Sequence, residues 1–129
     1  MEKMKQEHEI LKPEEIELDR PTSRLICIYH ALSHPVRFTI CKHLLQRPHT
    51  VGELLEILDM KQYAVSQQLA VLRNSDIVET ERQSRNIIYS LRSDAVRRIL
   101  RVSMRNTGVE FEHESNEPQR KASGFARVG

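Results

Sequence analysis

Polar side chains gather in the second half of residues 51–73, VGELLEILDMKQYAVSQQLAVLR. The second half of this stretch alternates apolar positions with side chains that carry hydrogen-bond donors and acceptors. The polar members near its start are Lys61, Gln62, Tyr63, Ser66 and Gln67. Amide and hydroxyl groups pair with the base edges of a duplex groove, and ammonium groups pair with phosphate. The chemistry that these residue types predict is recognition of DNA.

Each polar residue has an expected role. Gln62 and Gln67 are the candidates for reading base edges, because an amide can form two hydrogen bonds with adenine. Tyr63 is expected to contact a thymine methyl or a phosphate, and Ser66 suits either role. Two cations at the ends of the segment are expected to bind phosphate and fix the register: Lys61 and Arg73. The alternative for all of them is an ordinary solvated helix face.

A basic hairpin is predicted ten residues further on. Residues 77–82 and 86–91 have strand-like composition, and a short polar segment joins them. Arg82, Ser84 and Arg85 lie at its tip, where the arginines are expected to enter or straddle the minor groove. A helix-turn-helix followed by such a hairpin is a winged helix, so the expected fold is mainly α with a small β-hairpin.

The elements that position these residues follow from helical spacing of apolar side chains in five segments. Residue 22 or 23 is expected to cap the first segment, and a proline to open the second. Thr50 and Glu53 form a capping-box pattern before the third, after an expected loop at residues 47–49. Asp59 lies at the turn before the fourth, where a left-handed backbone is often needed. Ser93 or Asp94 is expected to cap the fifth.

Charge divides the chain into regions. Residues 1–20 carry four Lys/Arg and seven Asp/Glu and are expected to form a flexible acidic arm. Residues 21–106 are expected to form the DNA-binding and dimerisation domain, in which residues 61–105 carry nine Lys/Arg and four Asp/Glu. That basic region suits phosphate. Residues 107–129 read as a disordered tail.

The sequence has no signal peptide or membrane-length apolar run, so a cytoplasmic location is expected.

Four motifs in order carry a resemblance to a known family: ALSHPVR, VGEL, AVSQQLAVLR and IIYSL. Residues 22–105 resemble the ArsR/SmtB family of bacterial winged-helix repressors. The segment SDAVRRIL also resembles the branch that contains the nodulation repressor NolR and lacks the usual metal sites. The sequence departs from the family pattern at Asp59, Lys61, Tyr63 and Gln68, which stand where Gly, Ser, a small residue and His are common.

The resemblance implies a homodimer joined by its first and last helices, with Leu25, Ile28, Ile99 and Val102 as contact or core residues. It further implies that the fourth helices of two subunits enter successive major grooves of a palindromic operator, ~34 Å apart. Such a protein usually blocks transcription until an inducer weakens its binding to DNA.

The sequence lacks the usual metal ligands of the family, so no metal site of that kind is expected and no cofactor is predicted. Thr50 and Gly52 replace a Cys-x-Cys pair in the third helix. The positions of the ligand pairs along the last helix are held by residues that bind metals poorly: Ser93, Ala95, Asn106 and Val109. A third grouping has helical spacing, although Pro35 interrupts it: Cys27, His30 and His34.

Cysteine chemistry supplies the main alternative for the signal. Cys27 and Cys41 lie in neighbouring predicted helices, so a redox or reactive-sulfur switch stays open. The competing interpretation of Cys41 is a small packed hydrophobe. His43 and His49 are expected in solvent.

Two other functions fit the sequence less well than DNA binding. A winged helix that binds only proteins would present a more apolar face. An enzyme would need a nucleophile–base pair, a carboxylate pair or a metal cluster, and the sequence offers none. Three further arginines read either as additional DNA contacts or as solvated charge: Arg92, Arg97 and Arg98.

Overall fold

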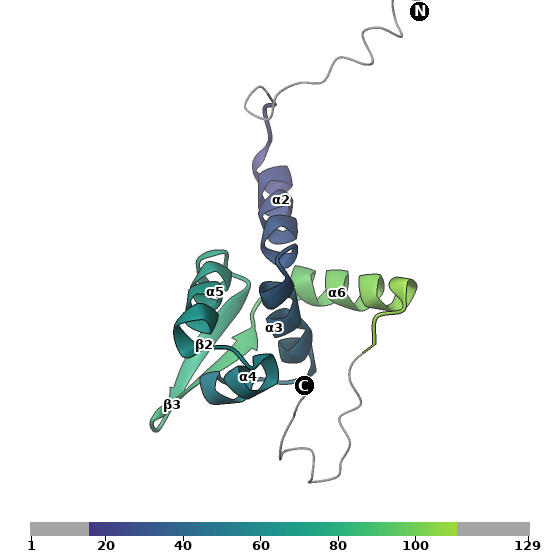
Figure 1. Cartoon of the computed structure of the whole chain (residues 1–129). Helices are drawn as coiled ribbons and strands as arrows, with labels where there is room; N and C mark the ends of the chain where they lie inside the picture. The colour runs from purple at the N-terminus through teal and green to yellow at the C-terminus, as the bar shows by residue number, and fades with distance from the viewer. Residues whose placement is uncertain (1–15, 111–129) are drawn as a thin grey trace, which may run out of the picture.

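The computed structural model describes residues 16–110, which form five helices and three short strands (Figure 1). Residues 1–15 of the expected arm and residues 111–129 of the expected tail lie outside this part. The helices are α2 (Arg20–Leu32), α3 (Pro35–Gln46), α4 (Val51–Leu58), α5 (Gln62–Asn74) and α6 (Asp94–Thr107). The strands are β1 (His49–Thr50), β2 (Val78–Gln83) and β3 (Asn86–Leu91).

The start of α2 differs from the sequence prediction. Asp19 is the N-cap, and its carboxylate accepts a hydrogen bond from the backbone N–H of Thr22 at 2.8 Å. The expected cap at Thr22 or Ser23 is therefore wrong. Pro21 lies in the first helical turn, where its missing N–H costs nothing.

The boundaries of the later helices follow the predicted signals. Thr50 and Glu53 form both bonds of the capping box at the start of α4. Asp59 ends α4 in the left-handed region, with φ 54° and ψ 49°. Ser93 caps α6 by accepting from the N–H of Val96. The turn between α4 and α5 is thus set by local sequence.

The sheet is antiparallel, with strand order β1-β3-β2. Strands β2 and β3 form the predicted hairpin, with Ser84 and Arg85 at its turn. The short strand β1 was not predicted: His49 pairs with Tyr89, and Thr50 pairs with Ile88. Two residues carry too little alternation to predict a strand, and this one forms because β3 offers a free edge.

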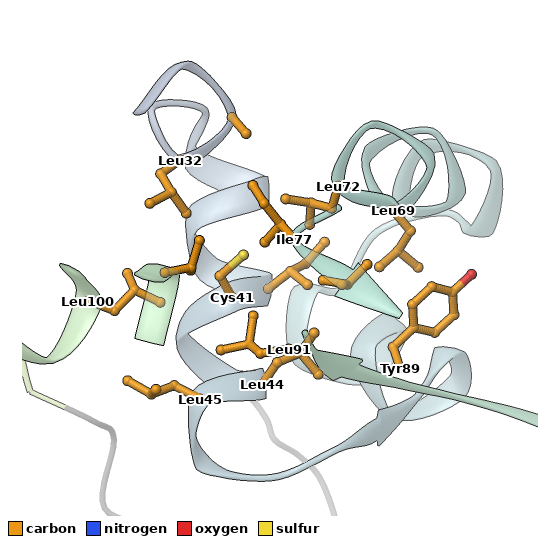
Figure 2. Close-up of a cluster of buried hydrophobic side chains, with 14 of the residues drawn as sticks. Leu32, Cys41, Leu44, Leu45, Leu69, Leu72, Ile77, Tyr89, Leu91 and Leu100 are labelled. Atoms are coloured by element: carbon orange, nitrogen blue, oxygen red, sulfur yellow. The ribbon is translucent and has the colours of Figure 1, made fainter. Parts of the chain in front are cut away.

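The core lies around α3, between α5 and the hairpin on one side and α6 on the other (Figure 1). Figure 2 shows side chains from these elements meeting in one cluster. Ile40 and Cys41 from α3, Leu72 from α5 and Leu100 from α6 are almost completely buried. No helix within residues 16–110 combines the length and apolarity that crossing a bilayer requires.

Candidate nucleic-acid interface

Helix α5 has one buried side and one polar side. Val65, Leu69 and Leu72 pack into the core, as their spacing predicts. The other side leaves all the candidate contact residues of this segment exposed: Lys61, Gln62, Tyr63, Ser66, Gln67 and Arg73. Tyr63 is 69% exposed, so its side chain is available to a thymine methyl or a sugar.

The N-terminus of α5 is open. Lys61 is the N-cap residue, and no side-chain hydrogen bond caps the helix there. The first backbone N–H groups of a helix carry partial positive charge and lack partners within the helix. Together with the Lys61 ammonium, they form a suitable contact for a phosphate.

The β2–β3 hairpin, here called the wing, runs beside α5 and extends past the body of the molecule (Figure 1). Arg82, Ser84 and Arg85 are all exposed at its tip. Ser84 has φ 58°, which gives the two-residue turn its left-handed position. Within residues 16–110, neither arginine has an ion-pair partner. The wing therefore presents two available guanidinium groups.

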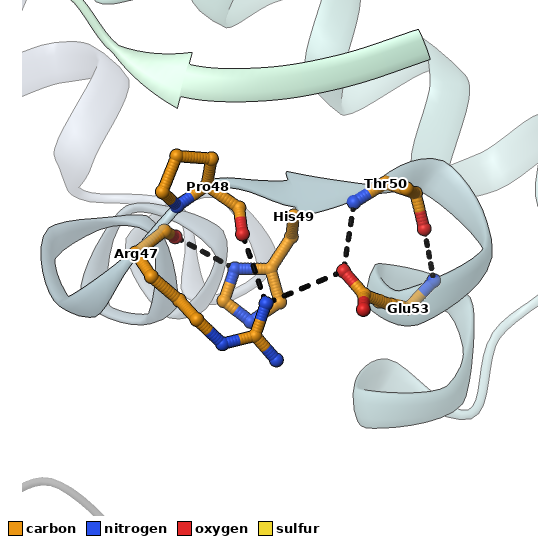
Figure 3. A network of polar contacts seen from close by, with 5 residues as sticks. All are labelled: Arg47, Pro48, His49, Thr50 and Glu53. Carbon is orange, nitrogen blue, oxygen red and sulfur yellow. Dashed lines mark hydrogen bonds and ion pairs between the residues drawn. The ribbon is translucent and has the colours of Figure 1, made fainter. Parts of the chain in front are cut away.

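A polar network joins β1 and the loop before it to the first turn of α4 (Figure 3). The carboxylate of Glu53 accepts from the backbone N–H of Thr50 at 2.9 Å, and Thr50 Oγ1 accepts from Glu53 N–H at 3.1 Å. Arg47 donates to the same carboxylate at 3.5 Å and to the Pro48 carbonyl at 3.0 Å. His49 Nδ1 lies 2.8 Å from the Arg47 carbonyl. The capping box thus also anchors the strand that pairs with β3.

His49 is buried, at 2% exposure, so its predicted solvent position is wrong. Burial, followed by the charge of Arg47, lowers its pKa from 6.5 to about 4. His43 is half-buried rather than solvated, and its ring lies edge-on to that of His49 with centroids 6.1 Å apart. Residues 47–49 were predicted as a loop, and that prediction missed the short strand that places His49 inside.

Arg37 has a structural role that its position in the ALSHPVR motif did not predict. It is buried, and its Nε donates to the Ala31 carbonyl at 2.8 Å. Its Nη1 donates to Gln68 Oε1 at 2.8 Å, and its Nη2 lies 3.4 Å from the His30 carbonyl. A buried guanidinium needs several hydrogen-bond acceptors, but the helical spacing of residues in the sequence does not identify them.

The two cysteines are in different environments. Cys41 is fully buried beside Arg37, and burial raises the pKa of its thiol to about 12, although the nearby guanidinium opposes the change. Cys27 is exposed on α2, and both cysteines are free. The packed interpretation of Cys41 is therefore confirmed, and a switch that needs a low-pKa thiol at both positions does not fit this structure.

The Cys27, His30 and His34 spacing does not produce a cluster. His34 is the N-cap of α3, and its Nδ1 accepts from the Val36 N–H at 3.1 Å. Within the described residues, no group of three or more His, Cys, Asp or Glu side chains could hold a metal ion.

The arginines that follow the wing differ in their contacts. Arg92 lies 3.5 Å from the Asp76 carboxylate, and Arg97 donates to the Leu91 carbonyl at 2.7 Å. Arg98 is exposed on α6. Helix α6 lies across α3 from α5 (Figure 1), so Arg97 and Arg98, which belong to α6, do not extend the face formed by α5 and the wing.

The residues expected at a subunit contact divide into two kinds. Ile28 is 3% exposed and Ile99 is partly buried, so both already belong to the core of the single chain. Other large apolar side chains remain exposed on α2 and α6: Leu25, Ile26, Tyr29 and Val102. Leu25 is 42% and Val102 50% exposed.

Comparison with known proteins gives consistent matches. A family described as "Helix-turn-helix domain" matches residues 32–81. The biofilm growth-associated repressor of Agrobacterium fabrum is 35% identical over 83 residues, which cover 64% of this chain and 71% of the relative. The solved structure of HlyU from Vibrio cholerae aligns with TM-score 0.67 and 27% identity, covering 70% of this chain and 99% of that one. NolR from Sinorhizobium fredii aligns with TM-score 0.65 and 30% identity, covering 79% and 99%.

Proposed function

Because the chain belongs to the ArsR/SmtB-type family of winged helix-turn-helix transcriptional regulators, which bind DNA and are not enzymes, we propose that it is a homodimeric repressor of a palindromic operator. In this proposal it acts in the cytoplasm, and an as yet undefined signal releases it from DNA. The observation that carries the proposal is the polar face of α5, exposed beside a wing with two available arginines.

The α5 side chains have different roles in recognition of DNA. Gln62 and Gln67 read base edges, and Tyr63 and Ser66 add contacts to methyl groups or phosphates. Lys61 and the open helix N-terminus bind one phosphate, and Arg73 binds another at the far end of the helix. In the wing, Ser84 shapes the turn, and two guanidinium groups approach the adjacent minor groove: Arg82 and Arg85.

The dimer buries the exposed apolar face of α2 and α6. Leu25 and Val102 supply the contact between subunits, together with their exposed neighbours Ile26 and Tyr29. Ile28 and Ile99 support this face from inside the core of each subunit. A two-fold axis through this contact relates the α5 helices of the two subunits, and the half-sites of a palindrome have the same symmetry.

The test is an electrophoretic mobility shift assay with genomic fragments selected by the purified protein, repeated at several salt concentrations. Specific duplex binding should weaken steeply with salt, because neutralised phosphates release counterions. Arg85→Ala should weaken binding to all sequences and lower the magnitude of the salt slope by about two, because the dimer loses one such contact in each subunit. Arg105→Ala, which removes an exposed arginine from α6, is the matched control and should leave the slope unchanged.

A protein-binding module would give a different result. It would select no fragment, and its association with DNA would show no specific component at any salt concentration. Equal slopes for the wild type and Arg85→Ala would remove the wing from the interface.

A further inference from the structure

Arg37 joins the end of α2 to the middle of α5. The carbonyls of His30 and Ala31 lie in the last turn of α2, where carbonyl groups carry partial negative charge. The His30 carbonyl also accepts from the N–H and the hydroxyl of Ser33, so the shorter contact of Arg37, to Ala31, is the main one at this helix end. The same guanidinium donates to Gln68 Oε1 at 2.8 Å. Because the fork is planar and buried, satisfying α2 and Gln68 together fixes both in one arrangement.

A second arginine joins the same two helices further along. Arg24 Nη1, from α2, donates to the carbonyl of Ser75 at 2.6 Å. Ser75 is the C-cap of α5, seven residues after Gln68, or ~10 Å along the helix axis. Core packing of Val65, Leu69 and Leu72 already holds α5 against the rest of the domain. The two arginine contacts, separated along the length of α5, add direct polar connections from this helix to α2.

We infer that Arg37 and Arg24 are positioning residues for DNA recognition: they fix the direction of α5 relative to α2, and so the spacing between the two reading helices of the dimer. This inference rests on the proposed function, in which the exposed apolar face of α2 meets a second subunit. In each subunit, the two arginines then connect α5 to α2. The contact between the two subunits connects one α2 to the other, so the two α5 helices are linked through both.

Operator spacing is the readout that separates positioning from stability. Each base pair inserted between half-sites moves them ~3.4 Å apart and turns one by ~34° relative to the other. A rigid pair of reading helices should reject such an insertion, because only one half-site can then be engaged well. A loosened pair should bind more weakly to the best operator but tolerate the change.

The experiment uses the full-length protein and the palindromic operator that it selects from random DNA, with zero, one or two base pairs inserted at the centre. Gln68→Met removes the acceptor for Arg37 at similar volume, while Gln68→Glu keeps an acceptor. Arg24→Met cuts the second attachment at an exposed position and serves if Gln68→Met does not fold. Gln46→Met, at an exposed site on α3, controls for the loss of an amide.

We expect wild-type affinity to fall about tenfold or more on one insertion. For Gln68→Met and Arg24→Met, affinity for the best operator should fall roughly threefold to tenfold, and the penalty for the insertion should shrink to about threefold or less. Gln68→Glu and the Gln46→Met control should keep the wild-type profile.

The possible failures are distinguishable. If the wild type selects no palindrome or has no spacing preference, the proposed function fails, and this inference fails with it. If the wild type prefers one spacing and Gln68→Met and Arg24→Met lose affinity equally at every spacing, the arginines only stabilise the fold. In that case the inference fails and the proposed function stands.

Discussion

Gln67 and Gln68 are adjacent amides of the same helix with different surroundings. Gln67 is exposed on the reading face, whereas the Gln68 side chain accepts from the buried Arg37. The 3.6-residue period predicts that Gln67 faces outward, because Val65 and Leu69 face inward. The period does not predict the partner of Gln68, since that partner comes from a helix more than twenty residues earlier.

Replacing Gln67 by Ala tests base reading at a single position. The variant should fold normally, because the side chain is exposed, and should lose about 1–3 kcal/mol of discrimination at one base pair of each half-site. The measurement compares Kd values for the selected operator and for random duplex. Random DNA is the internal control, since phosphate contacts are unaffected. Equal losses on both duplexes would mean that Gln67 reads no base.

The cysteines can be distinguished by their reaction with iodoacetamide. Cys27 is exposed, whereas Cys41 is buried with a pKa near 12 and has almost no thiolate at neutral pH. In the native protein we expect rapid alkylation of Cys27 and none of Cys41; in urea both should react. Mass spectrometry counts the adducts. Rapid labelling of Cys41 in the folded protein would reopen the reactive-sulfur alternative.

At the scale of elements, most helix boundaries could be predicted because their signals are local. The capping box at Thr50, the left-handed Asp59 and the Ser93 cap each depend on residues within one turn. The start of α2 was misplaced because three residues within one helical turn, Asp19, Thr22 and Ser23, can all cap a helix, and sequence alone does not rank them. Strand β1 depends on a partner forty residues away and leaves no local pattern.

Strand β1 makes stability depend on pH through His49. The pKa of His49 is about 4 in the folded chain and about 6.5 when unfolded, so below pH 6.5 the unfolded chain binds the proton first. Its contribution to stability is therefore complete above pH 6.5 and is lost as pH falls towards 4, at about 1.4 kcal/mol per pH unit.

The test compares urea unfolding of the wild type and His49→Asn between pH 4 and pH 7.5. Asn can place a donor near the Arg47 carbonyl but does not titrate. The free energy of unfolding should fall more steeply with acid in the wild type than in the variant, and the difference removes the contribution of other carboxyl groups. Parallel curves would show that His49 is not the titrating group.

At the scale of the whole molecule, the two sides of α3 have different surfaces. Helix α5 and the wing present amides and arginines, whereas α2 and α6 leave large apolar side chains in water. The sequence predicted the first surface, because its polar residues are contiguous. Of the four residues expected in the second, only Leu25 and Val102 are well exposed, since the same helical spacing describes a core contact and a subunit contact equally well.

Introducing charge on that apolar face tests the dimer. Leu25→Glu and Val102→Glu should each leave the single-chain core intact, because both side chains are about half exposed. A second copy would have to bury the new carboxylate, which is costly without a partner. Sedimentation velocity should show monomers at concentrations where the wild type is dimeric. Affinity for the palindrome should fall much more than affinity for a single half-site, because only the palindrome engages two reading helices at once.

Leu25→Met keeps the apolar surface and should behave as the wild type. Dimers of both glutamate variants with unchanged operator affinity would place the subunit contact elsewhere on the molecule.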